Sequence, residues 1–271
     1  MPRYRAVVAY DGSDFLGFQI QSKNGVERHR TVQGELIKAV NQMGKNPEER
    51  IKVVGASRTD TGVHANGQVV HFDLPFDIPG EGVRKGLNTI LPRDILIHEV
   101  RQVDNDFHAR FSSHNKRYYY RVSTQDYVDP FKRRYTGHFH WKLDPKRIEK
   151  ALPDLIGEQD FATFAASGNQ TATTVRTITR ADVDVKEDEH ELVFTFEGNA
   201  FLYNQIRIMV GVLLEIGTGR RETDCIPKLI AAKDREQARY TAPAAGLYLD
   251  YISYDGSQDL KQEETDNQPA D

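Results

Sequence analysis

Apolar and polar residues in the first part of the chain alternate in a pattern that predicts four strands and two helices. The predicted elements are a strand at 3–10, a helix at 31–44, strands at 51–56 and 68–74, a short helix around 83–91 and a strand at 94–103. Within the first helix, Val32, Leu36, Val40 and Met43 recur at three- and four-residue spacing, which places them on one face. The order of elements is β-α-β-β-α-β.

The second half of the chain repeats this order. Its predicted elements are a strand at 117–123, a helix from 144 to about 156, strands at 175–185 and 191–198, a helix at 201–217 and a strand at 247–254. Asp144 followed by Pro145 is typical of a helix start. The order β-α-β-β-α-β is that of the ferredoxin-like split βαβ unit. We therefore predict an α+β fold of two ferredoxin-like (RRM-like) subdomains, with their sheets side by side and a cleft between them.

The predicted boundary between the subdomains lies near 104–115. Residues 1–106 would form the N-terminal subdomain and residues 107–254 the C-terminal one, which completes the cleft. The tail at 255–271 carries six acids and few apolar residues, a composition typical of disorder.

Charge is distributed unevenly along the chain. The net charge is −4, but the tail at 255–271 alone sums to −5, because it holds six acids and one lysine, and the rest of the chain is close to +1. Residues 107–150 hold eleven Lys and Arg against four Asp and Glu, together with ten aromatic residues. Basic charge interleaved with aromatic rings suits a surface that binds the backbone of a nucleic acid and stacks on its bases. The alternative is a set of core aromatics beside a solvated charged face.

Several classes of chemistry are disfavoured by the sequence. No apolar run is long enough to span a membrane, and the single cysteine, Cys225, fits a reducing cytoplasm. Glycine-rich phosphate loops are missing. His138 and His140 have no carboxylate at ligand-like spacing, so we expect no metal site. Catalysis without a metal or cofactor would depend on carboxylates and arginines.

The run from Gly55 to Ala65 contains the most informative carboxylate. It joins two predicted strands, so a turn there would hold reactive groups at the end of a sheet. Arg58 lies two residues before Asp60, and a cation this close is expected to lower the pKa of Asp60. An ionised carboxylate can act as a nucleophile or general base. The alternative is structural, because Asp beside Gly often hydrogen-bonds its own backbone in a turn.

Six motifs, in order along the chain, resemble those of the tRNA pseudouridine synthase A family. The most specific is S-R-T-D-T-G-V-H-A at 57–65. The others are Tyr10-Asp11-Gly12 with Phe15, Gly17, Gln19 and Gln21, and the segments 107–112, 116–120, 198–211 and 242–247. The resemblance spans about residues 3–253. One departure is Ser57, which stands where the family usually has glycine.

The resemblance implies an isomerase that converts uridine to pseudouridine. Asp60 matches the catalytic nucleophile, and Arg58 matches a residue that holds the phosphate of the flipped nucleotide and pairs with the aspartate. Arg207 matches an arginine that pairs with Asp60 from the second half of the chain. Tyr118 matches the aromatic residue that stacks on the target uracil, and Leu247 an apolar residue that lines the base pocket.

The resemblance also implies the substrate and the assembly. The family acts on the anticodon stem-loop of tRNA, at positions 38, 39 and 40, without a cofactor and as a homodimer. Arg110 and Lys116 lie in matched motifs and are predicted to bind the substrate. The remaining cations of the predicted RNA surface are Arg117, Arg121, Lys132, Arg133 and Arg134.

Physical arguments agree with these roles. A stacked base must leave the RNA stem before a carboxylate can reach it, at a cost of a few kcal/mol. Stacking on an aromatic ring returns about 1–3 kcal/mol. Arg207 stands in an apolar helix, where an unpaired charge costs several kcal/mol, so we expect it to meet Asp60. Two other hypotheses are a non-catalytic RNA-binding protein on the same fold and a glycosidase, which usually requires a second carboxylate.

Overall fold

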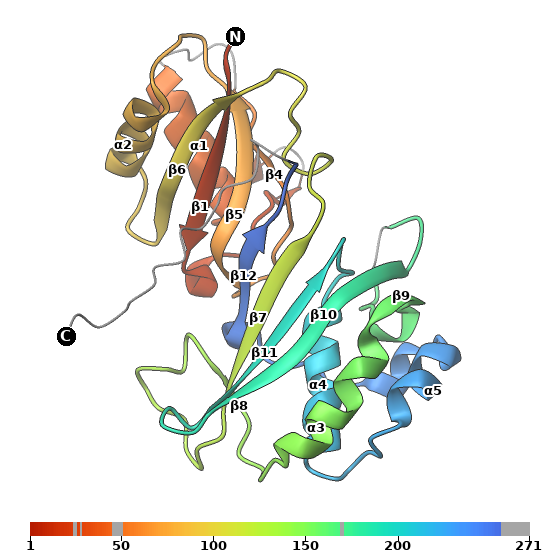
Figure 1. Ribbon diagram of the computed structural model, residues 1–271. Helices are drawn as coiled ribbons and strands as arrows, with labels where there is room; N and C mark the ends of the chain where they lie inside the picture. Colours follow the sequence, from red (N-terminus) through yellow and green to blue (C-terminus); the bar gives the residue numbers. More distant parts are fainter. Residues whose placement is uncertain (24–25, 28, 45–50, 169–170, 256–271) are drawn as a thin grey trace, which may run out of the picture.

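The computed structural model describes residues 1–23, 26–27, 29–44, 51–168 and 171–255. Ten strands form one sheet with the order β6-β1-β5-β12-β7-β11-β10-β9, with β4 added to β5 and β8 to β7 (Figure 1). Its strands are β1 (Arg3–Tyr10), β4 (Val54–Gly55), β5 (His64–Asp73), β6 (Ile95–Val103), β7 (Lys116–Ser123), β8 (Gly137–His138), β9 (Gly157–Asp160), β10 (Val175–Lys186), β11 (Glu191–Gly198) and β12 (Leu247–Ile252). A separate two-stranded sheet contains β2 (Ser22–Lys23) and β3 (Val26–Glu27).

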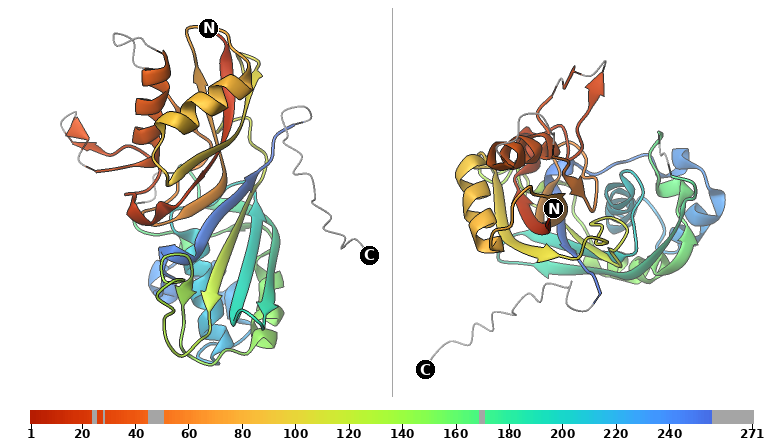
Figure 2. Two further views of the ribbon diagram at one scale, coloured as in Figure 1. Left: turned by 90° about the vertical axis from the view of Figure 1, so that its left-hand side faces the viewer. Right: turned by 90° about the horizontal axis from the view of Figure 1, so that it is seen from above.

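Helices of both halves lie on the same side of this sheet (Figure 2). They are α1 (Val32–Gly44), α2 (Gly80–Ile90), α3 (Pro145–Ala151), α4 (Gln205–Gly217) and α5 (Cys225–Ala232). Short 3₁₀ turns are η1 (Gly12–Asp14), η2 (Leu152–Leu155), η3 (Ala162–Phe164), η4 (Arg235–Ala238) and η5 (Ala244–Gly246). Within the described ranges, no helix is both long and apolar enough to cross a bilayer.

Each half of the sheet is a ferredoxin-like unit. In the N-terminal unit the strands lie in the order β6-β1-β5-β4, and each neighbouring pair is antiparallel. In the C-terminal unit the order is β12-β7-β11-β10, again with antiparallel neighbours. Both orders are 4-1-3-2 when the strands of each unit are numbered along the chain. The predicted fold class, α+β with two ferredoxin-like units, is confirmed.

The two units join edge to edge through β12. This strand pairs antiparallel with β7 of its own unit and parallel with β5 of the other, where Tyr248 lies opposite His64 and Leu249 opposite Ala65. β4 occupies a different part of the β5 edge, opposite His71 and Val70. The predicted neighbouring sheets are therefore one continuous sheet.

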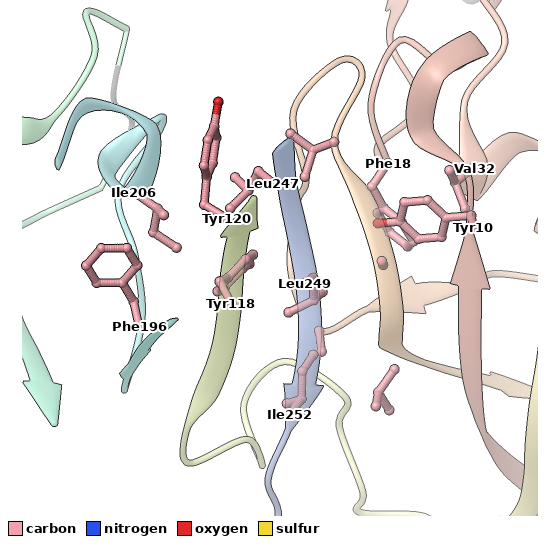
Figure 3. Packing of buried hydrophobic residues seen from close by; sticks show 14 of the residues in the cluster. Tyr10, Phe18, Val32, Tyr118, Tyr120, Phe196, Ile206, Leu247, Leu249 and Ile252 are labelled. Atoms are coloured by element: carbon pink, nitrogen blue, oxygen red, sulfur yellow. The ribbon is translucent and has the colours of Figure 1, made fainter. Parts of the chain in front are cut away.

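The hydrophobic core also continues across this junction. In Figure 3, Tyr118 on β7 and Leu249 on β12 lie between Phe196 of the C-terminal unit and Tyr10 of the N-terminal unit. All four side chains are buried in one cluster. Burial of an apolar side chain contributes about 1.5–3 kcal/mol, so this shared core fixes the position of one unit against the other.

Several predicted boundaries shift because partners distant in sequence decide them. In segment 51–56 the ladder register with β5 covers Val54 and Gly55, so β4 has two residues. β5 begins at His64 instead of 68, because its first residues pair with β1 and β12. α4 begins at Gln205 instead of 201, after Asn204, whose φ is 59°. β9 and α5 were not predicted, and the sequence of β9, G-E-Q-D, has no apolar periodicity. Of the predicted disordered tail, only Asp255 lies within the described residues.

Candidate active site at the junction of the two units

The turn between β4 and β5 carries Asp60 and is anchored at several points. The hydroxyl groups of Tyr10 and Thr59 are 2.7 Å apart. Phe18 N–H donates to the Thr59 carbonyl at 3.0 Å, and Val63 N–H donates to the Asp60 carbonyl at 3.1 Å. Gly62 has a φ of +76°, a conformation that glycine adopts without steric cost. The backbone around Asp60 is thus fixed by hydrogen bonds on both sides.

The residues just before Arg58 are held in the same way. The side-chain amide of Gln68, which is fully buried, accepts from Ser57 N–H at 3.2 Å and donates to the Ser57 carbonyl at 2.8 Å. Ala56 N–H donates to the Val69 carbonyl at 2.8 Å. Lys116 Nζ of the other unit donates to the Ala56 carbonyl at 3.1 Å. Both units therefore position this turn.

Asp60 and Arg207 form an ion pair between the two units, as the sequence predicted. Arg207 Nη1 lies 3.7 Å from Asp60 Oδ2, and the two side chains expose 17% and 20% of their surface. Arg207 also donates to the Ala242 carbonyl at 2.7 Å and to Asn204 Oδ1 at 2.8 Å. These bonds orient the guanidinium, so a partly buried charge meets a partly buried carboxylate.

The electrostatics of Asp60 differ from the sequence prediction. Burial raises its pKa above the ordinary value, and the positive charge of Arg207 lowers it part of the way back. Arg58 is exposed, and among the described residues no salt bridge joins it to Asp60. The prediction that Arg58 lowers the pKa of Asp60 is therefore wrong. Arg58 is only two residues from Asp60 in the sequence, but their side chains do not come together. The cation that faces Asp60 is Arg207 of α4.

Tyr118 lies beside this turn on β7. Its hydroxyl is 2.8 Å from Ser57 Oγ, and its ring meets Phe201 edge to face at 5.3 Å between centroids. Only 6% of Tyr118 is exposed, and burial raises its pKa to about 12. The phenol therefore stays protonated at neutral pH.

The other predicted substrate contacts lie around these groups. Leu247 is buried at the start of β12 and follows η5, whose Ala244 lies next to Gly62 of the β4–β5 turn. Arg110 is exposed. Lys116 is 9% exposed, and its pKa falls to about 8 because of burial and the positive charges of Arg110 and Arg176. Arg110 and Lys116 therefore lie in one positively charged region next to the turn.

Sequence reasoning missed the residues that hold the site. Gln68 gave no signal beyond being polar at a position next to an apolar run, and Tyr10 and Asn204 stood in matched motifs without an assigned role. Their importance depends on which strands pair and in what register, which no local pattern reveals.

The basic, aromatic segment at 107–150 was interpreted either as a surface that binds nucleic acid or as core aromatics beside a solvated charged face. The structure contains elements of both. Phe107, Tyr118, Tyr120 and Phe139 belong to the core. The exposed aromatics of this segment are Phe111, Tyr127, Phe131, Tyr135 and Trp141. The segment is thus part core and part exposed surface, and its exposed part keeps the predicted combination of cations and rings.

A shallow depression lies on the opposite face of the sheet. It is lined by Arg117, Tyr119, Arg180, Val193, Thr195 and Asp250. Tyr119 follows Tyr118 on β7, and successive side chains of a strand point to opposite faces. Arg117 is paired with Asp250 at 2.5 Å, so these charges satisfy each other. Within the described part of the chain, no three His, Cys, Asp or Glu residues gather as metal ligands.

Comparisons with known proteins identify the family of this chain. A crystal structure of the archaeal box H/ACA sRNP Nop10-Cbf5 complex aligns with a TM-score of 0.38 at 10% identity, covering 92% of this chain and 48% of the other, which is too distant to support an argument. The tRNA pseudouridine synthase A of Leuconostoc mesenteroides subsp. mesenteroides is 74% identical over 254 residues, covering 94% of this chain and all of that protein. The protein of the same name from Oenococcus oeni is 59% identical over 255 residues, covering 94% of this chain and 99% of its own. The family model described as tRNA pseudouridine synthase matches residues 6–112 and 151–255. With this match and these relatives, the chain belongs to the tRNA pseudouridine synthase family.

Proposed function

We propose that this protein is an isomerase that converts uridine to pseudouridine in tRNA, with Asp60 as the nucleophile. The observation that carries the proposal is the ion pair between Asp60 and Arg207, which joins the two units at a partly buried position. Family membership supports the reaction, and the hydrogen bonds around Asp60 support its assignment as the reacting group. A non-catalytic RNA-binding protein would not need a carboxylate held in this way.

The reaction exchanges one bond to the ribose for another. The N1–C1′ bond of uridine breaks, the uracil turns, and a C5–C1′ bond forms. The proton on C5 is lost and N1 gains one, so substrate and product have the same composition. Asp60 would attack either the base or the ribose, and both routes require its ionised form. Arg207 keeps that form available, because its charge opposes the effect of burial on the pKa of Asp60.

The surrounding residues would bind and orient the nucleotide. Arg58 is exposed on the turn itself and can hold a phosphate through its bidentate guanidinium. Arg110 and Lys116 add positive charge at the same side. Tyr118 would stack on the uracil, but only 6% of it is exposed. A base can therefore reach its ring only after a neighbour moves, and Phe201 is the neighbour in edge-to-face contact.

The test is Asp60→Asn, assayed by release of tritium from tRNA that carries uridine labelled at C5. We expect turnover to fall at least about a thousandfold, because the amide cannot act as a nucleophile, while tRNA binding is retained. Asp184→Asn, at an exposed carboxylate on β10, is the control and should keep full activity. Undiminished turnover in Asp60→Asn would rule out the proposal, and release of free uracil would indicate a glycosidase instead.

We further propose the finer properties that the family resemblance implies. These are modification of positions 38, 39 and 40 in the anticodon stem-loop, a homodimer, a cytoplasmic location, and the division into units at 1–106 and 107–254. Mapping of pseudouridine in tRNA treated with the enzyme tests the positions. Light scattering in solution tests the dimer.

A further inference from the structure

We propose that Ser57 is a positioning residue, whose hydroxyl group fixes Tyr118 relative to Asp60. The inference rests on the proposed function and adds a residue to it. Ser57 belongs to the same turn as Asp60, three positions earlier, and Tyr118 belongs to the other unit. The 2.8 Å contact between their hydroxyl groups is therefore a direct link between the turn that carries the nucleophile and the ring that would stack on the base.

The Ser57 side of this link is rigid. Its backbone N–H and carbonyl are both bound by the fully buried amide of Gln68. The carbonyl of the preceding Ala56 accepts from Lys116 Nζ, and Lys116 stands on the same strand as Tyr118, two residues earlier. The Ser57 hydroxyl is therefore presented to Tyr118 from a backbone that has little freedom to move.

On the Tyr118 side, the ring is buried in the core that the two units share. The strand fixes its Cα, and Phe201 packs edge to face at 5.3 Å. The hydroxyl at the far end of the ring is where a hydrogen bond has most leverage on the direction of the ring axis. A buried tyrosine hydroxyl requires a partner, and Ser57 supplies one from the catalytic turn.

Loss of this bond should misplace the ring that orients the base. Catalysis depends steeply on the alignment of reacting groups, whereas binding of the rest of the tRNA involves the exposed cations. Ser57→Ala is therefore expected to lower kcat by about three- to tenfold, the range that corresponds to one buried hydrogen bond, with KM for tRNA unchanged. Ser57→Thr keeps a hydroxyl group and is expected to retain at least about half of the wild-type kcat, under the same reasoning.

A double-mutant cycle separates positioning from a general loss of stability. Tyr118→Phe keeps the ring but removes its hydroxyl group. If Ser57 acts through that hydroxyl, Ser57→Ala has no further effect on kcat in the Tyr118→Phe background, because the bond is already missing. Ser123→Ala, at a buried serine at the other end of β7, is the matched control and should match the wild type.

The outcomes distinguish this inference from the proposed function. Equal kcat in wild type and Ser57→Ala, or a double variant whose loss is the product of the two single losses, overturns the role of Ser57 while leaving Asp60 as nucleophile. A wild-type enzyme that forms no pseudouridine overturns both proposals. Tritium release by wild type, Asp60→Asn and the Ser57 and Tyr118 variants, measured side by side, decides among these results.

Discussion

The second helix of each ferredoxin-like unit occupies the same place in the topology but differs in chemistry. In the N-terminal unit this helix is α2, where only Val83 and Leu87 are buried. In the C-terminal unit it is α4, where nearly every residue is buried. The arginine of α2, Arg84, is paired with Glu81 on the exposed surface. The arginine of α4, Arg207, faces Asp60 of the other unit.

This difference shows how a repeated topology acquires one active site. An exposed pair between neighbouring helical positions contributes little. A partly buried arginine needs a partner, and the partner of Arg207 is the carboxylate on the β4–β5 turn of the N-terminal unit. The N-terminal unit thus contributes the carboxylate of Asp60, and the C-terminal unit contributes the guanidinium of Arg207. Neither unit contains the ion pair alone.

Among the variants that test this comparison, Arg207→Gln should have the largest effect on activity. It removes the cation that opposes the effect of burial on Asp60, and kcat/KM is expected to fall at least about a hundredfold. Circular dichroism and tritium release on the same sample measure fold and activity. Arg207→Lys keeps the charge but not the two hydrogen bonds of the guanidinium, so it should recover part of the loss. Full activity in the glutamine variant would contradict the role of the pair.

Arg58→Gln should have a smaller effect of a different kind. Arg58 is exposed and among the described residues forms no salt bridge with Asp60, so we expect KM for tRNA to rise by about tenfold with kcat nearly unchanged. The salt dependence of tRNA binding should weaken, because one phosphate contact is lost. A fall in kcat with an unchanged KM would mean that Arg58, and not Arg207 alone, acts on Asp60.

Lys116→Met should change the pH dependence of stability. Burial and neighbouring cations lower the pKa of Lys116 from 10.5 to about 8, so the folded state holds fewer protons than the unfolded state between these values. The free energy of unfolding of the wild type should therefore rise with pH from about 8 to 10.5. The methionine variant lacks this titration and should show a flatter profile in urea unfolding. Parallel profiles would mean that Lys116 is solvated.

Arg84→Gln should have the smallest effect. Its partner Glu81 lies three positions earlier on the exposed face of α2, and such pairs contribute little in water. We expect no measurable change in the Tm or in tritium release. A clear loss of activity here would remove the contrast between the two helices.

Much of the fold was predictable because local pattern determines it. Both β-α-β-β-α-β series were visible in the spacing of residues such as Val32 and Leu36. A single arginine in the apolar sequence of α4 indicated a carboxylate partner, and the family resemblance implied that this partner is Asp60. Contacts set by strand register were not predictable. The Gln68 amide reaches Ser57, and the Ser57 hydroxyl reaches Tyr118, only because β4, β5, β12 and β7 meet in one sheet. The wrong prediction for Arg58 has the same origin, since proximity in sequence did not give proximity in space.

The most direct measurement is a titration of the Asp60 carboxyl carbon by ¹³C NMR, in the wild type and in Arg207→Gln. The account predicts a pKa above the ordinary aspartate value of 3.8 in the wild type and a higher one in the variant, because burial remains and the opposing cation is removed. The acidic limb of the kcat/KM profile should move to higher pH in the same order. A wild-type pKa at or below 3.8, or one that Arg207→Gln leaves unchanged, would contradict the claim that the two units build this site around a partly buried ion pair.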